Sequence, residues 1–249
     1  MKNNFFFKNT FSNIYEKSSK ESPVSSQILY GEKFKIISKK RNWLKIKTSF
    51  DNYVGYIKNK DYKKNHNPTH KVFSLKTKVY QKKVNKKNYF LPFASKISII
   101  DENTRFVEFE KNKWIKKTDI KKIAYIEKDY TKILRLFIKT KYFWGGKTYN
   151  GVDCSALLQL FFYFNNKFYP RDTKDQIKYL KKKLKKNIFK KGDIIFWKGH
   201  VAICINNKEL IHAFGPKKKV LVMGIKKTIL EIKEKSKLSV MSIKNINEY

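Results

Sequence analysis

The chain has 249 residues, of which 41% are hydrophobic and 16% aromatic, so it can bury sizeable cores and does not have the composition of a disordered chain. Its net charge of +38 would favour a nucleic acid or another anionic partner. Nearly all of that charge is lysine spread along the chain, and only four arginines are available for the forked contacts that read base edges. We therefore interpret the lysines as a solvated surface and expect no nucleic acid partner.

Cysteine content and hydropathy restrict the compartment. The two cysteines, Cys154 and Cys204, are too few for a disulfide framework. No stretch approaches the roughly 20 apolar residues that span a membrane. Near the N-terminus the longest apolar run has three residues, fewer than the about 7–15 of a signal-peptide core. The sequence therefore predicts no membrane partner and a cytoplasmic protein, with the periplasm or cell envelope as the alternative.

Residues 11–122 carry short strand-like segments. Apolar and aromatic runs at 27–37, 42–48 and 53–57 are separated by turn-forming residues, and positions 43–48 alternate between apolar and polar side chains, the period of a half-buried strand. A polar segment, residues 65–70, reads as a linker, and we expect its two histidines, His66 and His70, to be solvated. The pattern then recurs in looser form.

Two successive all-β units fit this spacing of strands and turns, because closely spaced short strands are typical of small barrels. We predict an SH3-like barrel over residues 1–66 and a second over 67–122.

From residue 123 the pattern changes to helices followed by strands. Helical spacing appears at 127–140, a nearly all-apolar helix is expected at 153–166, and a third helix should start at Thr173, where Thr173 and Gln176 match a capping box. Strands are expected at 192–197, 200–205 and 209–214. Residues 123–249 are therefore predicted to form an α+β domain whose buried helix lies on the sheet.

Cys154 is the candidate nucleophile. It stands at the predicted first turn of the buried helix, where the backbone N–H groups and the positive end of the helix dipole lower the pKa of a thiol. A purely structural buried cysteine is the alternative. The flanking Asp153 and Ser155 argue against it, because they are poor core residues. Cys204, inside an aliphatic strand, is assigned to the core.

A thiol nucleophile needs a base, and histidine is the usual one. His200 opens the second predicted strand of the late sheet and His212 lies within the third. Adjacent strands would bring both imidazoles to one face, so that His200 can act as the base and His212 can orient it. A structural role is the safer reading for a single histidine, but two histidines placed in this way favour the catalytic one.

A metal centre would be the competing chemistry. The sequence has neither a CxxC pair nor an HExxH helix, whereas a closed zinc site needs four ligands with short-range pairs. We expect no metal and no other cofactor.

Six ordered blocks over residues 123–232 resemble the NlpC/p60 family of papain-like cysteine peptidases. They are YFWGG at 142–146, GVDCSALLQ at 151–159, YPRDTKDQ at 169–176, KKGDIIFW at 190–197, HVAICI at 200–205 and ELIHAF at 209–214. A single DCS would mean little, but six blocks in the family's order and spacing are specific. One departure is Ala156, where the family pattern usually has glycine.

The resemblance implies a Cys154–His200–His212 triad, with Tyr142 beside the nucleophile as a donor to the oxyanion together with the backbone N–H of Cys154. Packing is the alternative for Tyr142, and it is the role we expect for Trp144.

The resemblance also implies that Asp172 and Thr173 hold the ammonium group of a substrate with a free N-terminal L-alanine, although both could simply cap a helix. Arg171 could face either a substrate carboxylate or a structural acid.

The N-terminal region, especially residues 25–57, is similar to the SH3-like domains that precede such peptidases. In those relatives a loop of this domain closes one end of the substrate groove, and Tyr53 is the candidate contact here. The role of the second SH3-like unit stays open.

The predicted activity is hydrolysis of the γ-D-glutamyl–diamino-acid bond in short cell-wall peptides, with a small peptide as the partner and no cofactor. The main alternative is a hydrolase of intact wall whose SH3-like units bind the wall. A non-enzymatic binding module and an acyltransferase are further alternatives.

Overall fold

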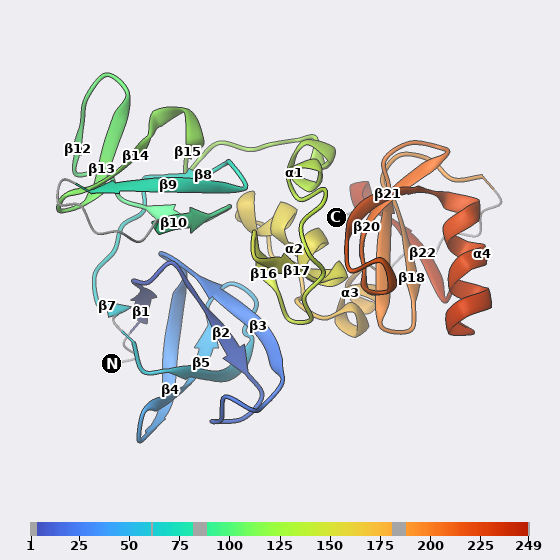
Figure 1. Cartoon of the computed structure of the whole chain (residues 1–249), viewed down its shortest axis with the longest axis horizontal. Helices are drawn as coiled ribbons and strands as arrows, with labels where there is room; N and C mark the ends of the chain where they lie inside the picture. Colours follow the sequence, from blue (N-terminus) through green and yellow to red (C-terminus); the bar gives the residue numbers. More distant parts are fainter. Residues whose placement is uncertain (1–3, 61, 82–88, 181–187, 249) are drawn as a thin grey trace. The chain divides into compact units, whose positions relative to one another are not determined.

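The computed structural model describes residues 4–60, 62–81, 89–180 and 188–248, and the chain divides into two compact units (Figure 1). Unit 1 consists of Met1–Glu127 together with the short segment Trp144–Tyr149. Unit 2 consists of Lys128–Phe143 and Asn150–Tyr249.

Unit 1 is built almost entirely of strands. Its elements within the described residues are β1 (Asn4–Phe7), β2 (Phe11–Tyr15), β3 (Val24–Leu29), β4 (Lys33–Lys40), β5 (Trp43–Thr48), β6 (Val54–Lys58), β7 (Tyr62–Lys63), β8 (His70–Val72), β9 (Lys76–Gln81), β10 (Tyr89–Pro92), β11 (Lys96–Ile97), β12 (Asp101–Glu102), β13 (Phe106–Glu110), β14 (Lys113–Lys116), the 3-10 turn η1 (Lys117–Asp119), β15 (Ile120–Lys122) and β16 (Lys147–Thr148). The first seven strands form one antiparallel sheet in the order β3-β2-β6-β5-β4-β1-β7.

The alternation predicted at 43–48 is confirmed in β5. Leu44, Ile46 and Thr48 are buried, while Trp43 and Lys45 stay partly exposed. A period of two places alternate side chains on opposite faces of the sheet, so one face of β5 closes over the first core. That core is formed by a cluster of buried aliphatic and aromatic side chains: Phe7, Ile14, Ile28, Phe34, Leu44, Ile46 and Ile57.

Strands β8–β15 form two further, smaller sheets, in the orders β10-β9-β14-β13-β12 and β11-β8-β15. Tyr30, from the end of β3, is fully buried in their core against Val72 and Phe109. Gly31 permits this approach, because its φ is +74° and a Cβ there would lie 1.9 Å from the carbonyl oxygen of Lys96. The two β regions of unit 1 are therefore in direct contact.

The predicted linker is more structured than its composition indicated. His66 is not a solvated side chain, because its ring contacts the Lys96 carbonyl at 3.0 Å and the Ser98 hydroxyl at 3.2 Å. His70 is partly buried and opens β8. Strand β1 lies before residue 11, where the predicted strand pattern begins, because three consecutive phenylalanines show no alternation between the two faces of a sheet.

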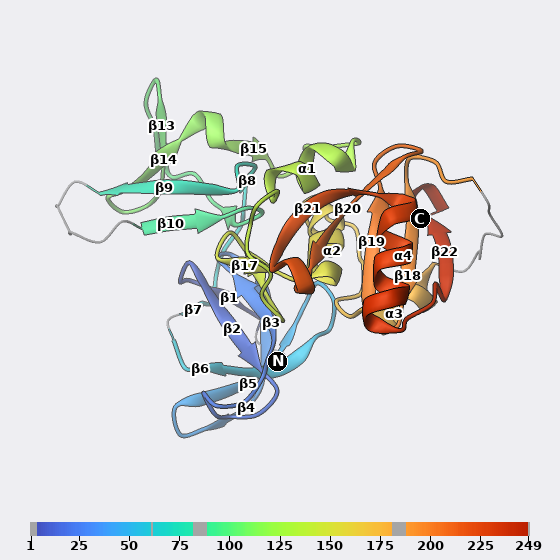
Figure 2. The same cartoon turned by 45° about the vertical axis from the view of Figure 1, so that its right-hand side comes forward.

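Unit 2 is a mixed α+β domain, and the predicted fold class is confirmed. Its elements are α1 (Tyr130–Leu136), β17 (Gly151–Val152), α2 (Cys154–Phe164), α3 (Thr173–Tyr179), β18 (Asp193–Trp197), β19 (His200–Cys204), β20 (Glu209–Phe214), the 3-10 turn η2 (Gly215–Lys217), β21 (Lys219–Gly224), α4 (Ile225–Ser236), β22 (Ser242–Asn245) and the 3-10 turn η3 (Ile246–Glu248). The sheet has the antiparallel order β21-β20-β19-β18-β22. Helices α2 and α4 lie on opposite sides of it (Figures 1 and 2).

Two parts of this domain go beyond the expected helices-then-sheet order. Strand β22 pairs with β18 from the far end of the chain, and α4 follows the sheet instead of preceding it. Ile225 and Ile232 of α4 are buried against Trp197 and Leu210 of the sheet. Their spacing of seven residues puts them on one helical face. Among the described residues, no helix combines the length and the apolar character needed to cross a bilayer.

A buried ion pair ties the segment Trp144–Tyr149 into unit 1. The Lys147 ammonium lies 3.3 Å from both carboxylate oxygens of Glu32, and both side chains are almost completely buried. Burial raises the pKa of Glu32, while Lys147 and the backbone N–H of Leu29 act in the opposite direction. Removing one partner leaves the other charge buried without compensation, which is the costly way to break such a pair.

We therefore expect Lys147→Met to lower the free energy of unfolding by about 3–5 kcal/mol. The double variant Glu32→Leu/Lys147→Met should recover most of that loss, because it buries no unpaired charge. Urea unfolding of both variants measures the difference. Lys117→Met is the matched control: its partner Glu102 is 60% exposed, so the expected loss is below about 1 kcal/mol. An equal loss of unfolding free energy in the single and double variants would contradict the assignment of Glu32 and Lys147 as a buried ion pair.

Candidate active site

The candidate nucleophile, Cys154, is the first residue of α2, as the sequence predicts. The preceding residue, Asp153, has an extended backbone and caps the helix: its carboxylate accepts a hydrogen bond from the backbone N–H of Ala156 at 2.8 Å. A capping carboxylate accepts a hydrogen bond from one of the free N–H groups of the first turn. It thereby fixes the residue at which the extended chain ends and the helix begins. The side chain of Cys154 is thereby fixed at the head of the helix.

The expected acidity of this thiol is wrong. Cys154 is only 5% exposed, and burial raises its pKa to about 11, with the neighbouring carboxylate of Asp153 adding to the effect. The backbone N–H of Val201 and the hydroxyl of Thr173 contact the sulfur and act in the opposite direction. Desolvation therefore outweighs the helix terminus, and the resting thiol carries its proton at neutral pH.

The two histidines lie together on adjacent strands. In the antiparallel register of β19 and β20, His200 and His212 fall on the same face, and Nε2 of His200 lies 3.0 Å from Nδ1 of His212. The ring of His212 stacks on Phe214, with centroids 4.6 Å apart and planes at 16°. Burial lowers the pKa of His200 to about 4 and the pKa of His212 well below its usual value. Both imidazoles are neutral at neutral pH and can accept a proton.

The thiol contacts the backbone on both sides of His200. Its Sγ donates to the carbonyl of Gly199 at 3.9 Å and receives the N–H of Val201. Within the described residues no hydrogen bond joins Cys154 directly to the His200 ring. Since Nε2 of His200 is engaged by His212, Nδ1 is the ring nitrogen left to take a proton from the thiol.

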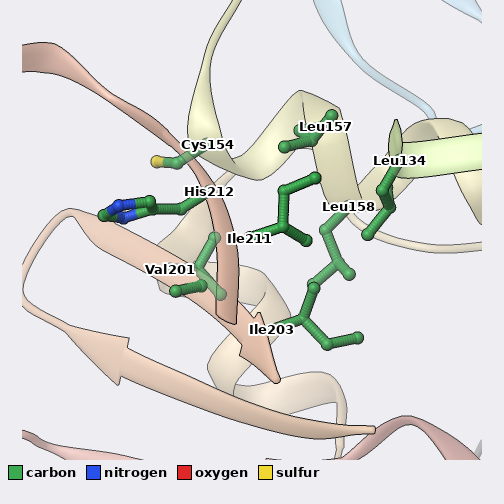
Figure 3. A pocket seen from close by; sticks show the side chains of 9 residues that line it. Leu134, Cys154, Leu157, Leu158, Val201, Ile203, Ile211 and His212 are labelled. Atoms are coloured by element: carbon green, nitrogen blue, oxygen red, sulfur yellow. The ribbon is translucent and has the colours of Figure 1, made fainter. Parts of the chain in front are cut away.

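A small cavity of about 10 Å³ lies beside the thiol. The sulfur of Cys154 and the imidazole of His212 lie at the same end of it, and the remaining wall is aliphatic (Figure 3). The wall comes from α1, α2, β19 and β20 through Leu134, Leu157, Leu158, Val201, Ala202, Ile203 and Ile211. This apolar surrounding explains why the thiol and the imidazole of His212 are stabilised in their uncharged forms.

Arg171 faces a structural acid, which settles the choice that the sequence left open. Its guanidinium donates to both carboxylate oxygens of Asp153, at 3.0 and 2.7 Å, and to the hydroxyl of Ser155 at 2.9 Å. All three side chains are buried. A two-point contact of this kind fixes orientation as well as distance. It therefore joins the start of α2 to the loop that leads into α3.

The predicted capping box at α3 is wrong. The helix begins at Thr173, so its N-cap is Asp172, whose side chain makes no capping hydrogen bond. Gln176 does not reach back to the helix start; its amide donates to the carbonyls of Ser155 and Pro170, at 2.9 Å each. The hydroxyl of Thr173 is turned to the sulfur of Cys154. Burial raises the pKa of Asp172.

The other predicted residues divide between the two units. Tyr142 lies close to the nucleophile: burial raises the pKa of its phenol, and a thiolate at Cys154 would raise it further, so the phenol keeps its proton. Trp144 belongs to unit 1 and is 61% exposed, so the expected packing role is wrong. Tyr53 also belongs to unit 1, where its hydroxyl donates to the carbonyl of Ser25 at 3.3 Å. Cys204 is fully buried in the sheet core, as expected.

Three contacts of the site were not anticipated. The backbone groups of Gly199 and Val201 carry no side-chain signal, although their position beside His200 could have drawn attention to them. Met223 of β21 lies with its sulfur 3.4 Å from Nε2 of His212. Nothing in the sequence marks that methionine, because its alternation with Leu221 is that of an ordinary strand.

The arrangement is suited to nucleophilic acyl transfer. It provides a thiol at a helix start, a neutral imidazole on the adjoining strand and a second imidazole behind the first. In the described part of the chain, no group of three or more His, Cys, Asp or Glu side chains is placed to hold a metal ion. An α+β domain with a thiol at a helix start and two paired imidazoles on neighbouring strands has the fold class that the sequence predicts.

Comparison with known families agrees with this class. Residues 139–235 match the sequence model of the NlpC/P60 family, and residues 14–61 match that of the bacterial dipeptidyl-peptidase Sh3 domain. The chain thus contains an NlpC/P60 domain preceded by a bacterial SH3 domain.

Two curated relatives match the chain over limited stretches. One is a Haemophilus influenzae protein named "Probable endopeptidase NlpC homolog", with 35% identity over 91 residues, which cover 35% of this chain and 49% of the relative. Another is "Dipeptidyl-peptidase 6" of Lysinibacillus sphaericus, with 34% identity over 77 residues, 31% of this chain and 28% of the relative. The matched region thus spans about half of the first relative's length and less than a third of the second's.

Solved structures show that the fold is shared. An NlpC/P60 family protein from Bacillus cereus superposes with a TM-score of 0.82 over 97% of this chain and 99% of its own, at 18% identity. An NlpC/P60 endopeptidase from Photobacterium damselae subsp. piscicida gives a TM-score of 0.63 over 97% of this chain and 70% of its own, at 12% identity.

A protonated resting thiol has a direct spectroscopic consequence. Since the pKa of Cys154 is about 11, we expect no thiolate between pH 5 and 8.5. Ultraviolet difference absorbance near 240 nm between the wild type and Cys154→Ser should therefore be flat over that range. Cys204→Ser serves as the control for the second thiol. A step in absorbance below pH 8.5 that Cys154→Ser abolishes would show a preformed thiolate instead.

Proposed function

We propose that the chain is a cysteine peptidase that cleaves the γ-D-glutamyl–diamino-acid bond of short cell-wall peptides with a free N-terminal L-alanine. The observation that carries the proposal is the buried thiol of Cys154, which contacts the backbone on both sides of His200, whose imidazole is in turn paired with His212 at 3.0 Å. The names of the two curated relatives, an endopeptidase and a dipeptidyl-peptidase, support the same class of reaction.

In the proposed first step the thiol sulfur attacks the substrate carbonyl while its proton passes to Nδ1 of His200. The C–S bond forms and the imidazole becomes an imidazolium, which His212 stabilises from behind through Nε2 of His200. The hydroxyl of Tyr142 and the backbone N–H of Cys154 donate to the oxyanion. His200 then gives the proton to the leaving amine as the C–N bond breaks.

Water completes the cycle in the second step. His200, neutral again, takes a proton from water as the oxygen attacks the thioester. The C–S bond then breaks, and His200 gives this proton to the departing sulfur, which returns both the thiol and the neutral imidazole. No cofactor takes part. Because Cys154 and His200 begin uncharged, charge is separated only during attack and not in the resting site.

Asp172 supports the preference for a free amino group. It is partly buried beside Arg171 and makes no capping bond at α3, so its carboxylate is available to an incoming cation. Its neighbour Thr173 contacts the sulfur of Cys154, which supports a role for this loop next to the scissile bond. An ammonium group at Asp172 would offset the cost of keeping a carboxylate there.

Cys154→Ala is expected to abolish hydrolysis of L-Ala-γ-D-Glu-diaminopimelate, followed by mass spectrometry of the products. The variant removes the atom that forms the thioester, so no compensating route remains. Cys204→Ala is the matched control: it should retain hydrolysis and lose about 1 kcal/mol or more of stability, because it opens a cavity in the sheet core. A well-folded Cys204→Ala protein without activity would mean that the nucleophile is wrongly assigned.

Asp172→Asn should raise KM for the free-amine tripeptide by at least tenfold and leave its KM for the N-acetylated peptide unchanged. The carboxamide keeps the shape of the side chain and removes the charge that would bind the ammonium. Asp175→Asn, one turn away and exposed, is the control. Unchanged kinetics on the free-amine substrate would end the proposed amine recognition.

The competing function is a hydrolase of intact wall with the SH3-like units as wall-binding modules. The match of residues 14–61 to a bacterial Sh3 domain is the observation in its favour. Release of fragments from insoluble wall, compared with cleavage of the free tripeptide, separates the two. Preference for the free peptide would support our further proposal that the chain works in cytoplasmic recycling of wall peptides.

A further inference from the structure

The proton positions of the two histidines are constrained by a contact at the back of the site. His200 and His212 share one hydrogen bond, so one of the two rings must donate it. If His200 donates from Nε2, its Nδ1 carries a lone pair and can act as the base. If His212 donates from Nδ1, the proton of His200 lies on Nδ1, and that nitrogen cannot accept a proton from the thiol.

The far nitrogen of His212 decides between these two states. Its Nε2 lies 3.4 Å from Sδ of Met223, the one hydrogen-bond partner of that nitrogen among the described residues. A thioether sulfur can accept a hydrogen bond and cannot donate one. Met223 is therefore compatible with a proton on Nε2 of His212, whereas a lone pair there would face the lone pairs of the sulfur.

We propose that Met223 is a positioning residue that holds His212 in the Nε2–H tautomer, so that Nδ1 of His212 accepts from His200 and Nδ1 of His200 keeps the lone pair that takes the thiol proton. The inference rests on the proposed function, because it assigns Met223 a part in that reaction. It adds a fourth member behind the triad, on the edge strand β21.

Two neighbours of His212 have different effects on its ring. Phe214 stacks flat on the ring, so it fixes the plane of the imidazole and has no influence on where the proton sits. Met223 lies at a ring nitrogen and acts on the proton. Replacing Met223 by an apolar residue of similar volume should therefore leave the fold and the stacking intact and remove only the acceptor.

Nitrogen-15 NMR of the histidine rings tests this without substrate. Long-range proton–nitrogen correlations distinguish protonated from unprotonated ring nitrogens, and His212→Gln assigns the signals of that ring. In the wild type we expect His212 to be protonated at Nε2. In Met223→Leu we expect a mixture of tautomers, and in Met223→Lys, whose ammonium donates to Nε2, a proton on Nδ1.

Hydrolysis provides the second readout. Met223→Leu should lower kcat about fivefold, the effect of losing one modest hydrogen bond, and leave KM unchanged. Met223→Lys should lower kcat at least a hundredfold. If that variant does not fold, the kcat of Met223→Leu alone tests whether Met223 contributes to turnover. Met241→Leu, at an exposed methionine, is the control and should behave as wild type.

A wild-type His212 protonated at Nδ1, or a Met223→Leu protein with unchanged tautomer and unchanged kcat, would overturn the inference. A wild type that cleaves none of the peptides would refute the proposed function alone, because the ring-nitrogen spectra would still show whether Met223 sets the tautomer.

Discussion

The carboxylate of Asp153 is the constraint on which the site depends. One side chain caps α2, which places Cys154 at the first helical position, and accepts both arms of the Arg171 guanidinium. Arg171 is followed directly by Asp172 and Thr173, so the same pair fixes the nucleophile and the proposed amine-binding loop relative to each other. The cost of removing both charges from water offsets much of the attraction in a buried pair, but a pair of this geometry leaves few alternative arrangements of the groups that it joins.

Burial governs the chemistry of the thiol more than its place on the helix does. The helix terminus, the Val201 N–H and the Thr173 hydroxyl all favour a thiolate, yet the pKa of Cys154 is raised to about 11. The pKa of His200 is lowered to about 4 by the same apolar surroundings. A dry pocket disfavours both members of an ion pair, so the acid and the base are kept neutral together. The hydrogen-bond donors proposed for the oxyanion therefore stabilise negative charge only when the reaction creates it.

Local patterns in the sequence were enough to predict the elements that hold the site, because each pattern has a local cause. The alternation at Leu44 and Ile46 defines β5, and the apolar run after Asp153 defines α2. The predictions failed where a side chain contacts residues that are distant from it in the sequence. Gln176 matches a capping box, but its amide satisfies carbonyls of a neighbouring loop. The acidity of Cys154 could not be inferred either, because it depends on packing from β19 and β20 that no stretch around residue 154 encodes.

A neutral resting site also has a consequence for selectivity. A buried thiol that keeps its proton is a poor target for oxidants, since oxidation proceeds through the thiolate. Asp153 contributes negative charge beside the sulfur and adds to the cost of ionising it. If a substrate ammonium binds at Asp172 as proposed, it brings a positive charge into the same low-dielectric region, where such interactions are strong. Binding of the correct substrate would then itself favour ionisation of the nucleophile, so recognition of the free amine and activation of the thiol would be one electrostatic event.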